Sequence, residues 1–335
     1  MKPATVAVLG AGAWGTTIAV MLARAGRPTT LCVRRAAQLE SFLKRRENST
    51  YLPGIAFPTG LKISDRWAEA VGAAGIVVMA IPSSFARAAL SGVVGAIRPG
   101  TIVVSATKGI EERTLLTMSA MLATLVAPGV KLAVLSGPGF AAEVAAGKPA
   151  ALVAAAAEEE TAREVQEIFS GNALRVYRSI DVRGIELAGA VKNVIAIATG
   201  IGDGLELGSS ARAAVITRGL AELTRLATAL RARPETIAGL AGLGDLVLTC
   251  TGELSRNRAL GVRLGRGEKV ADALGHGEGI PVAEGFANAR SIIELARRSG
   301  VEMPIVEAVY RALYEAEPPR DIVEGLLSRE LKAEF

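Results

Sequence analysis

The segment Val6-Ala-Val-Leu-Gly10-Ala-Gly12-Ala-Trp-Gly15 restricts the fold of this chain more than any other. A short apolar strand runs into a G-x-G-x-x-G pattern, and small apolar residues with helical spacing follow it. In such a turn the first glycine makes the bend, the second lets a pyrophosphate approach the backbone, and the third lets the helix pack on the strand. The pattern predicts a dinucleotide-binding βαβ unit, with its phosphates at the helix N-terminus. A glycine-rich turn of another α/β fold is the alternative.

Apolar, β-branched runs alternate with helical patterns in the first half of the chain. The predicted strands cover residues 5–9, 29–33, 75–81, 101–105, 131–135, 150–154 and 173–177, and the first predicted helices cover residues 13–25 and 36–46. After residue 180 the chain reads as helices separated by glycine-rich turns at residues 200–208, 239–244 and 275–279. We expect an α/β protein: a Rossmann-like, doubly wound NAD(P)-binding domain (1–180) and an all-helical substrate domain (181–335).

Composition excludes several classes of protein. The 335 residues are 50% hydrophobic and 21% charged, which is typical of a globular chain and not of a disordered one. The net charge of +5 is dispersed and aromatic residues make up 4%, so we expect no nucleic-acid partner. The uncharged run 3–23 is interrupted by glycines, which argues against a membrane span or a signal sequence. Cys32 and Cys250 form no metal or disulfide motif, so we expect no metal and a cytoplasmic location.

The end of the second predicted strand carries Arg34 and Arg35. An NAD-specific site places an acidic residue here, about 20 residues beyond the loop, to bind the ribose hydroxyls. Two guanidiniums instead suit a 2′-phosphate, because they form bidentate, charge-assisted hydrogen bonds with it. The pair therefore favours NADP(H) and leaves NAD(H) open. An exposed helix start is the alternative explanation of the two arginines.

Two lysines lie in apolar surroundings. Lys108 follows the predicted strand at its carboxyl end, where doubly wound folds bind ligands. Lys192 lies on a helical row of small and apolar residues. Burial and a second nearby cation would both lower the pKa of a lysine and make it a usable acid or base. The alternative interpretation of Lys192 is a side chain that snorkels to solvent, and that of Lys108 is an ordinary lysine at the end of a strand.

The helical half contains two further candidate segments. Asp245 is the one carboxylate in the apolar stretch 240–249; if buried it needs partners such as Lys192, and a helix N-cap is the alternative. Ser255-Arg256-Asn257 opens a helical pattern, in which Ser255 can cap while backbone N–H groups and the next two side chains face an anion. A plain basic helix start is the alternative for this segment. The single histidine, His276, lies in a glycine-rich loop, which disfavours acid–base chemistry at a histidine.

Seven motifs follow one another along the chain: Gly10-x-Gly-x-Trp-Gly15, Asn48-x-x-Tyr-Leu-Pro-Gly54, Ala106-Thr-Lys-Gly109, Ser136-Gly-Pro138, Ala190-Val-Lys-Asn-Val194, Gly242-Leu-Gly-Asp-Leu246 and Ser255-Arg-Asn257. Each has moderate specificity, but seven in one order argue against coincidence. Together, over residues 4–315, they resemble the bacterial NAD(P)-dependent glycerol-3-phosphate dehydrogenases. The resemblance implies reversible hydride transfer between NAD(P)H and dihydroxyacetone phosphate, which gives sn-glycerol 3-phosphate for phospholipid synthesis in the cytoplasm.

The resemblance also implies roles for individual residues. The catalytic group would be Lys192 as the proton donor and acceptor, Lys108 as the group that polarises the substrate oxygen, and Asp245 as a positioning group. These three residues would also bind the substrate, together with Gly137, Gly139, Asn193, Ser255, Arg256 and Asn257. The cofactor would be bound by Gly10, Gly12, Ala13, Trp14, Gly15, Arg34, Arg35, Lys108, Ala141, Arg256, Val282 and Glu284.

One position departs from the pattern of that family. After Ser136-Gly-Pro138 the family usually has Ser or Thr, whose hydroxyl reaches the substrate, whereas this chain has Gly139. One buried hydrogen bond contributes about 0.5 to 1.5 kcal/mol, so we expect weaker substrate binding without loss of activity. The backbone N–H groups of Gly137 and Gly139 are the remaining donors.

Two other functions stay open. A dehydrogenase of the same architecture that acts on a β-hydroxy acid or a ketopantoate-like substrate would also place a lysine on the first interdomain helix, but has no need for the anion site at 255–257. A non-catalytic NADP(H)-binding sensor would keep the glycine loop without needing Lys192 and Asp245. The oligomeric state is open, and a homodimer is compatible with the sequence.

Overall fold

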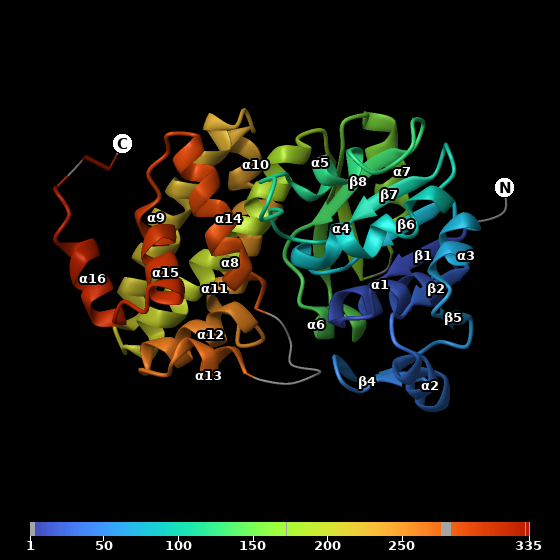
Figure 1. Cartoon of the computed structure of the whole chain (residues 1–335), viewed down its shortest axis with the longest axis horizontal. Coiled ribbons are helices and arrows are strands. Elements are labelled where there is room, and N and C mark those ends of the chain that lie inside the picture. The colour runs from blue at the N-terminus through green and yellow to red at the C-terminus, as the bar shows by residue number, and fades with distance from the viewer. Residues whose placement is uncertain (1–3, 172, 276–282, 332, 335) are drawn as a thin grey trace.

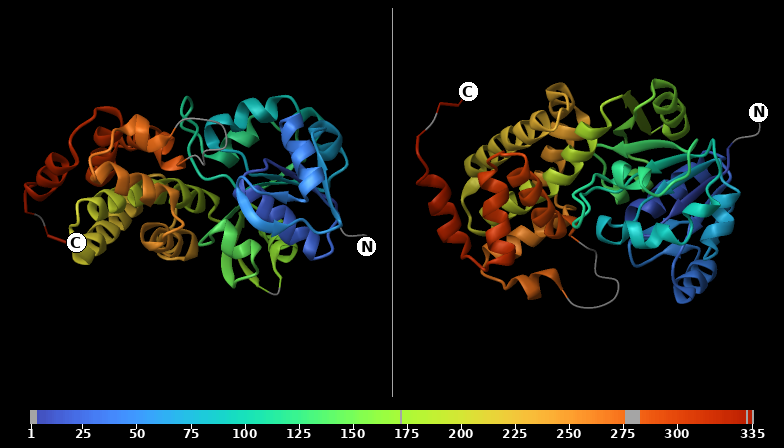
Figure 2. Two further views of the ribbon diagram at one scale, coloured as in Figure 1. Left: turned by 90° about the horizontal axis from the view of Figure 1, so that it is seen from below. Right: turned by 45° about the horizontal axis from the view of Figure 1, so that its top comes forward.

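The computed structural model describes residues 4–171, 173–275, 283–331 and 333–334. Figure 1 shows two parts side by side along the long axis, a sheet-containing part in blue to green and a helical part in yellow to red. The two further views in Figure 2 show the same division. The expected fold class, a Rossmann-like sheet followed by a helical C-terminal part, is confirmed.

Eight strands form the main sheet, in the order β10-β9-β8-β7-β6-β1-β2-β5. They are β1 (Val6–Leu9), β2 (Thr29–Cys32), β5 (Leu61–Ser64), β6 (Ile76–Met79), β7 (Ile102–Ser105), β8 (Lys131–Ser136), β9 (Ala150–Ala156) and β10 (Leu174–Ser179). Seven coincide with predicted runs; β5 and a separate ribbon of β3 (Glu47–Asn48) and β4 (Leu52–Ala56) do not. Neighbouring strands are parallel except β8 and β9. The strand order reverses beside β1, which is where such folds bind nucleotides.

Helices cover both faces of this sheet. Alternate residues of β1 enter different hydrophobic clusters, Val6 and Val8 on one face, Ala7 and Leu9 on the other. The first cluster includes side chains of α1 (Ala13–Arg24), α2 (Ala36–Arg45) and α7 (Glu159–Phe169). The second includes side chains of α3 (Trp67–Gly72), α4 (Ser83–Ser91) and α5 (Met118–Ala123). A strand that is buried on both faces must be apolar throughout, as Val6–Leu9 is.

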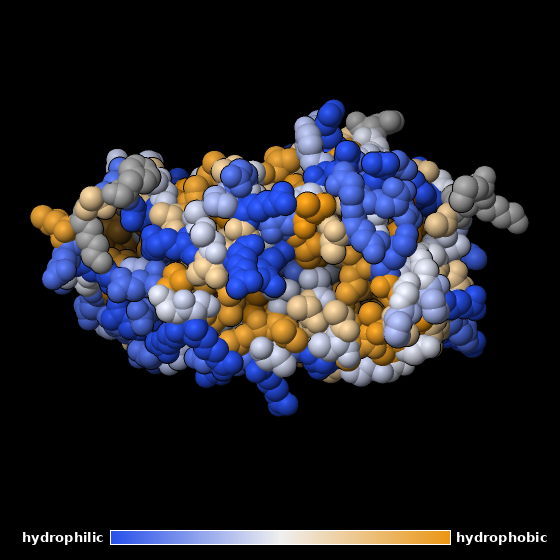
Figure 3. Space-filling model, turned by 90° about the horizontal axis from the view of Figure 1, so that it is seen from above, coloured by the Kyte–Doolittle hydropathy of each residue, from blue (hydrophilic) through white to orange (hydrophobic). Residues whose placement is uncertain are grey.

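The helical part is built around α8 (Val182–Gly204). The other helices of this part are α9 (Gly208–Ala229), α10 (Pro234–Ala238), α11 (Asp245–Thr251), α12 (Arg256–Gly265), α13 (Val270–Leu274), α14 (Glu284–Arg298), α15 (Pro304–Tyr314) and α16 (Pro319–Leu327). Within the described residues, α8 alone is long and apolar enough to cross a membrane, but 94% of its apolar stretch is buried inside the protein. It is therefore the core helix of this part, and its side chains meet those of its neighbours in one hydrophobic cluster. Figure 3 shows hydrophilic and apolar side chains interspersed over the upper face of the molecule.

The expected glycine turn at residues 200–208 is wrong in its first half, because α8 continues to Gly204. A Cβ atom at Gly200 would lie 2.1 Å from the carbonyl oxygen of Arg258, and one at Gly204 would lie 2.4 Å from that of Val262. These glycines therefore allow α8 and α12 to pack backbone against backbone. The turn expected at residues 239–244 contains a π-helical turn, Leu240–Gly244, directly before α11. Of the turn expected at residues 275–279, residues 276–279 lie outside the described residues.

Candidate active site

The glycine loop joins β1 to α1 as predicted. Gly10 has a φ of +107°, and a Cβ atom on it would lie 2.4 Å from the carbonyl oxygen of Ala80. A Cβ atom on Gly15 would lie 2.0 Å from the carbonyl oxygen of Gly10. The packing of the protein thus requires both glycines. A Cβ atom on Gly12 would meet nothing within 4 Å, so this position opens onto space, as close approach by a pyrophosphate demands.

A buried carboxylate joins the two predicted lysines. Asp245, the first residue of α11, lies with Oδ1 2.5 Å from Nζ of Lys192 and with Oδ2 2.6 Å from Nζ of Lys108. Asp245 is 1% exposed and Lys192 is 6% exposed. The ion-paired interpretation of Asp245 is therefore confirmed over the helix-cap alternative, since α11 has no side-chain cap. Lys192 does not snorkel to solvent, because its ammonium group ends in this buried pair.

Local structure brings these groups together. Lys108 Nζ also donates to the carbonyl oxygen of Gly137, at 3.3 Å, which ties the ends of β7 and β8 to the cluster. On α8, the absence of a side chain at Gly189 leaves room for the Lys108 stem, since a Cβ atom there would lie 3.3 Å from Lys108 Cγ. The π-helical turn 240–244 ends directly at Asp245. Single π turns are frequent at functional sites, and this one sets the position at which Asp245 enters the cluster.

The environment of Lys192 makes its proton easier to remove. Burial, with the Lys108 charge also opposing protonation, lowers the pKa of Lys192 from 10.5 to about 8, although the Asp245 carboxylate acts in the opposite direction. Burial raises the pKa of Asp245, but the charges of Lys108 and Lys192 outweigh it, so the pKa of that carboxyl is lowered. Asp245 therefore stays ionised, and Lys192 titrates closer to neutrality than an ordinary lysine does.

A chain of amides links this cluster to α12. Asn193 Oδ1 accepts a hydrogen bond from Asn257 Nδ2 at 2.9 Å, and Asn257 Oδ1 accepts one from the backbone N–H of Gly285 at 2.9 Å. Asn193 Nδ2 is buried and has no hydrogen-bond partner among the described residues. A buried, unused donor beside Lys192 suits a ligand oxygen. Ser255 is the predicted N-cap of α12, because its hydroxyl accepts from the backbone N–H of Arg258.

The remaining predicted residues lie around this centre or beside the glycine loop. Arg256 is the exposed first residue of α12, and Glu284 begins α14. Burial raises the pKa of Glu284, while Arg256, Lys108 and Lys192 lower it, which places this carboxyl near three cations. Ala141 begins α6 (Ala141–Ala145), and its carbonyl accepts a hydrogen bond from Thr17 of α1 at 3.0 Å.

The two arginines predicted to bind the cofactor are not part of the central cluster. Arg34 and Arg35 are exposed and lie apart from it, at the carboxyl end of β2 and at the N-cap of α2. Val282, like His276, falls outside the described residues. Within the described ranges, no group of three or more His, Cys, Asp or Glu residues is placed to hold a metal ion.

Comparisons with known proteins assign the family. Two family models match: the N-terminus of NAD-dependent glycerol-3-phosphate dehydrogenase at residues 5–162, and its C-terminus at residues 181–324. The chain belongs to this glycerol-3-phosphate dehydrogenase family. A glycerol-3-phosphate dehydrogenase (NAD(P)+) of Geobacter sulfurreducens is 50% identical over 331 residues, which cover 98% of each chain. The resemblance stated from the motifs is therefore confirmed.

Solved structures support the same assignment. The glycerol-3-phosphate dehydrogenase structure from Coxiella burnetii is 38% identical, with a TM-score of 0.92, and covers 98% of this chain and 100% of that chain. A ketopantoate reductase from Ralstonia eutropha is 18% identical, with a TM-score of 0.61, and covers 96% of this chain and 99% of that chain. The second likeness shows a shared fold alone. The family match thus favours the glycerol-3-phosphate dehydrogenases over the ketopantoate-like alternative.

Two residues of this glycerol-3-phosphate dehydrogenase family member have contacts that the sequence did not indicate. The Thr249 hydroxyl accepts a hydrogen bond from Lys192 Nζ at 2.7 Å and donates one to the carbonyl oxygen of Asp245 at 2.6 Å. Its position four residues after Asp245, on the same helical face, is the signal that could have identified it. Asn48 is fully buried and donates to the carbonyl oxygen of Ala11 at 3.0 Å, so it supports the glycine loop from the β3–β4 ribbon.

Proposed function

We propose that this chain catalyses the reversible, NAD(P)H-dependent reduction of dihydroxyacetone phosphate to sn-glycerol 3-phosphate, which serves glycerophospholipid synthesis. The observation that carries the proposal is the buried cluster of Lys192, Asp245 and Lys108, next to the α12 segment that begins with Ser255. The family assignment and the names of the relatives support the same reaction. A non-catalytic sensor has no use for two buried charged groups with a third, partly buried one beside them, since burial of charge is costly.

Lys192 is the proton donor in reduction and the proton acceptor in the reverse direction. When bound, the nicotinamide supplies the hydride to the ketone carbon. Negative charge then grows on the ketone oxygen, and two ammonium groups stabilise it before Lys192 transfers its proton. Of its three N–H donors, Lys192 uses two on Asp245 and Thr249, which leaves one for the substrate oxygen. Its pKa of about 8 makes this proton transfer easier than from an ordinary lysine.

Asp245, Thr249 and Lys108 position the proton donor. Asp245 holds Lys192 through one carboxylate oxygen and Lys108 through the other, so the two ammonium groups stay side by side. Asn193, through its unused Nδ2, donates to an oxygen of the substrate. The phosphate of the substrate binds at the α12 N-terminus, where backbone N–H groups, Ser255, Arg256 and Asn257 supply donors.

The cofactor fits the residues present. Gly12 faces open space at the end of β1, and Trp14 Nε1 is buried without a partner among the described residues. Gly10, Gly12, Ala13, Trp14 and Gly15 would hold the pyrophosphate region, and Arg34 and Arg35 the adenosine end. Both NADP and NAD are compatible with the relatives' names, and we propose a preference for NADP(H) because both arginines are exposed beyond β2.

One assay tests the proposed function. Initial rates of NADPH and NADH oxidation are measured with dihydroxyacetone phosphate and, as a matched control, with unphosphorylated dihydroxyacetone. We expect rapid oxidation with the phosphorylated ketone alone, because the phosphate supplies binding energy that aligns the carbonyl. No oxidation with either ketone, in protein that binds NADPH, would overturn the proposed substrate.

Three further proposals accompany the function. We divide the chain into domains 1–180 and 181–335; limited proteolysis that cuts near residue 180 and releases two stable fragments would support this division. We place the protein in the cytoplasm, in keeping with two buried free cysteines, to be checked by cell fractionation. We propose a homodimer, which sedimentation equilibrium tests through the measured mass.

A further inference from the structure

A second group of charged side chains surrounds a cavity in the helical part. The cavity has a volume of about 300 Å³ and lies where the end of α8, the start of α9 and the outer face of α12 meet. None of its lining residues belongs to the cluster around Lys192. Its polar lining consists of Asp203, Glu206, Ser209, Arg212, Arg258 and Arg266.

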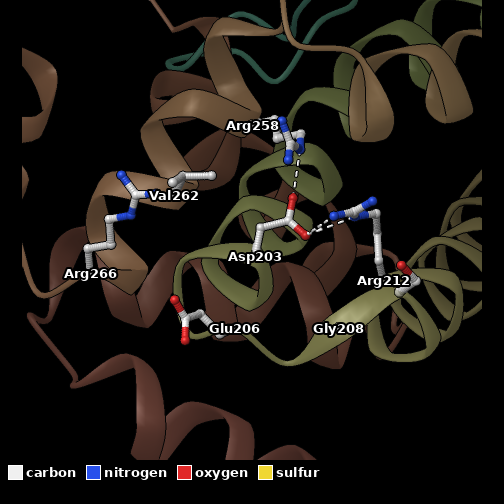
Figure 4. Close-up of a pocket in the computed structure, with 8 residues that line it drawn as sticks. Asp203, Glu206, Gly208, Arg212, Arg258, Val262 and Arg266 are labelled. Atoms are coloured by element: carbon white, nitrogen blue, oxygen red, sulfur yellow. Dashed lines mark hydrogen bonds and ion pairs between the residues drawn. The ribbon is translucent and has the colours of Figure 1, made fainter.

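Asp203 holds two of the three arginines. Arg212 Nε lies 2.8 Å from Asp203 Oδ1, and Arg258 Nε lies 2.7 Å from Asp203 Oδ2. Figure 4 shows the two guanidiniums converging on this carboxylate from α9 and α12. A guanidinium has five N–H donors, so each arginine keeps donors that Asp203 does not use. A single carboxylate also balances only one of the two positive charges.

Arg266 contributes a third guanidinium from the end of α12. Its side chain makes no hydrogen bond or ion pair with any residue of the described ranges, and in Figure 4 it lies across from Arg212, on the far side of Asp203. With Glu206 included, three guanidiniums and two carboxylates line the cavity, which leaves it net positive. The N-terminus of α9 forms part of the same wall and has no side-chain cap on its free N–H groups.

We propose that this cavity binds a phosphate group, as free phosphate or as a phosphate monoester, at a site separate from the active site. Arginine forks match phosphate oxygens in geometry and retain their charge at every physiological pH. The uncapped N-terminus of α9 adds N–H donors of the kind that bind phosphate in many proteins. The volume accommodates a phosphate with a small organic group, and the Asp203 contacts hold two of the guanidiniums in place before the anion arrives.

The site communicates with the active site through α12. Arg258 is the residue directly after Asn257, whose amide binds Asn193 beside Lys192. The backbones of α12 and α8 are in direct contact at Gly200 and Gly261, so a shift of one helix displaces the other. A Cβ atom on Gly261 would lie 2.1 Å from the carbonyl oxygen of Ile197. An anion that binds Arg258 in the cavity therefore changes the affinity of the active site for the substrate phosphate. This consequence, unlike the binding itself, rests on the proposed function.

Titration calorimetry with inorganic phosphate, on the full chain without cofactor, tests the binding. We expect two phosphate sites in the unaltered protein. Arg266→Gln should weaken one of them about tenfold or more, which is the effect of one lost charge-assisted contact. Ser209→Asp, which places a carboxylate beside the cavity at a position favourable to helix stability, should abolish the same site. Arg256→Ala should affect only the other site.

Arg263→Gln is the matched control. It removes one arginine from the same helix, but the Arg263 guanidinium binds Glu268 and the carbonyl oxygen of Ala273, away from the cavity. Two sites should remain in this variant. The proposal is overturned if Arg266→Gln and Ser209→Asp titrate like the unaltered protein, or if sedimentation shows that a second copy of the chain covers the cavity and only one phosphate binds. Because the readout is binding, failure of the dehydrogenase assay leaves this test unaffected.

Discussion

Lys108 and Lys192, from the two different parts of the molecule, hold opposite oxygens of the same buried carboxylate. Lys108 follows β7 of the sheet and reaches Asp245 Oδ2 at 2.6 Å, and Lys192 of the core helix α8 reaches Oδ1 at 2.5 Å. The contact couples the position of the proton donor to the way the two parts pack. The Asp245 carboxylate also controls the charge of Lys192, because it raises the pKa of that lysine.

Asp245→Asn tests that control through the pH dependence of the reaction. The Asp245 charge raises the pKa of Lys192, while burial lowers it to about 8. Without the charge the pKa should fall further, because the protonated lysine loses its counter-ion. As the proton donor in reduction, Lys192 must be protonated, so the decline of kcat/KM with rising pH should move to lower pH, and kcat should fall about 100-fold or more.

The measurement is the pH profile of NADPH oxidation with dihydroxyacetone phosphate, in the variant and in the unaltered protein. A decline at unchanged pH would mean that it does not report Lys192. A decline at higher pH would reverse the assigned sign of the Asp245 contribution.

Thr249→Val removes the hydroxyl that accepts from Lys192 at 2.7 Å while keeping the side-chain shape. We expect kcat/KM to fall about tenfold or more, in line with one hydrogen bond to a charged group, and the pH profile to move to lower pH. Thr249→Ser keeps the hydroxyl and should restore both. If the serine variant is as impaired as the valine variant, packing and not the hydroxyl is responsible.

Gly139→Ser should improve substrate binding. A Cβ atom on Gly139 would lie 3.4 Å from Val144 and 3.6 Å from Leu152 and Trp14, which are ordinary van der Waals contacts. The added hydroxyl can therefore be accommodated, and KM for dihydroxyacetone phosphate should fall about two- to tenfold, as expected for one buried hydrogen bond. Gly139→Ala, with the Cβ atom alone, should leave KM unchanged. An equal effect of both variants would argue against a hydrogen bond at this position.

Arg34→Asp tests the cofactor preference. The substitution replaces the exposed guanidinium beyond β2 with a carboxylate. A carboxylate repels a 2′-phosphate and accepts hydrogen bonds from ribose hydroxyls. We expect the ratio of kcat/KM for NADPH to that for NADH to fall about tenfold or more. An unchanged ratio would show that Arg34 does not contact the 2′-phosphate.

Sequence patterns predicted the elements that obey a simple periodicity. Strands buried on both faces, such as Val6–Leu9 and Ile76–Met79, read as continuous apolar runs, and the glycine loop fixed the order of strand and helix. The short β5, Leu61–Ser64, lies at the sheet edge and is only partly buried, so it lacks such a run. The sequence predicts a turn at Gly200 because it does not show that another helix packs against this glycine.

The candidate site was predictable residue by residue but not as an arrangement. Lys192 and Asp245 stood out as charges in apolar stretches, which is why their partnership could be anticipated. For Thr249 the sequence offers only its position four residues after Asp245, and the distance to Lys192 is what shows its role. The charge balance around Asp203 likewise depends on three helices meeting in space.

The most direct test of the account is the rate of NADPH oxidation with dihydroxyacetone phosphate in Lys192→Ala, measured beside the dissociation constant for NADPH. We expect the rate to fall about 1,000-fold or more, because the proton donor is gone, while NADPH binding changes about twofold at most. Retention of most of the rate, with NADPH still bound, would contradict the assignment of Lys192 as the acid and base of the reaction.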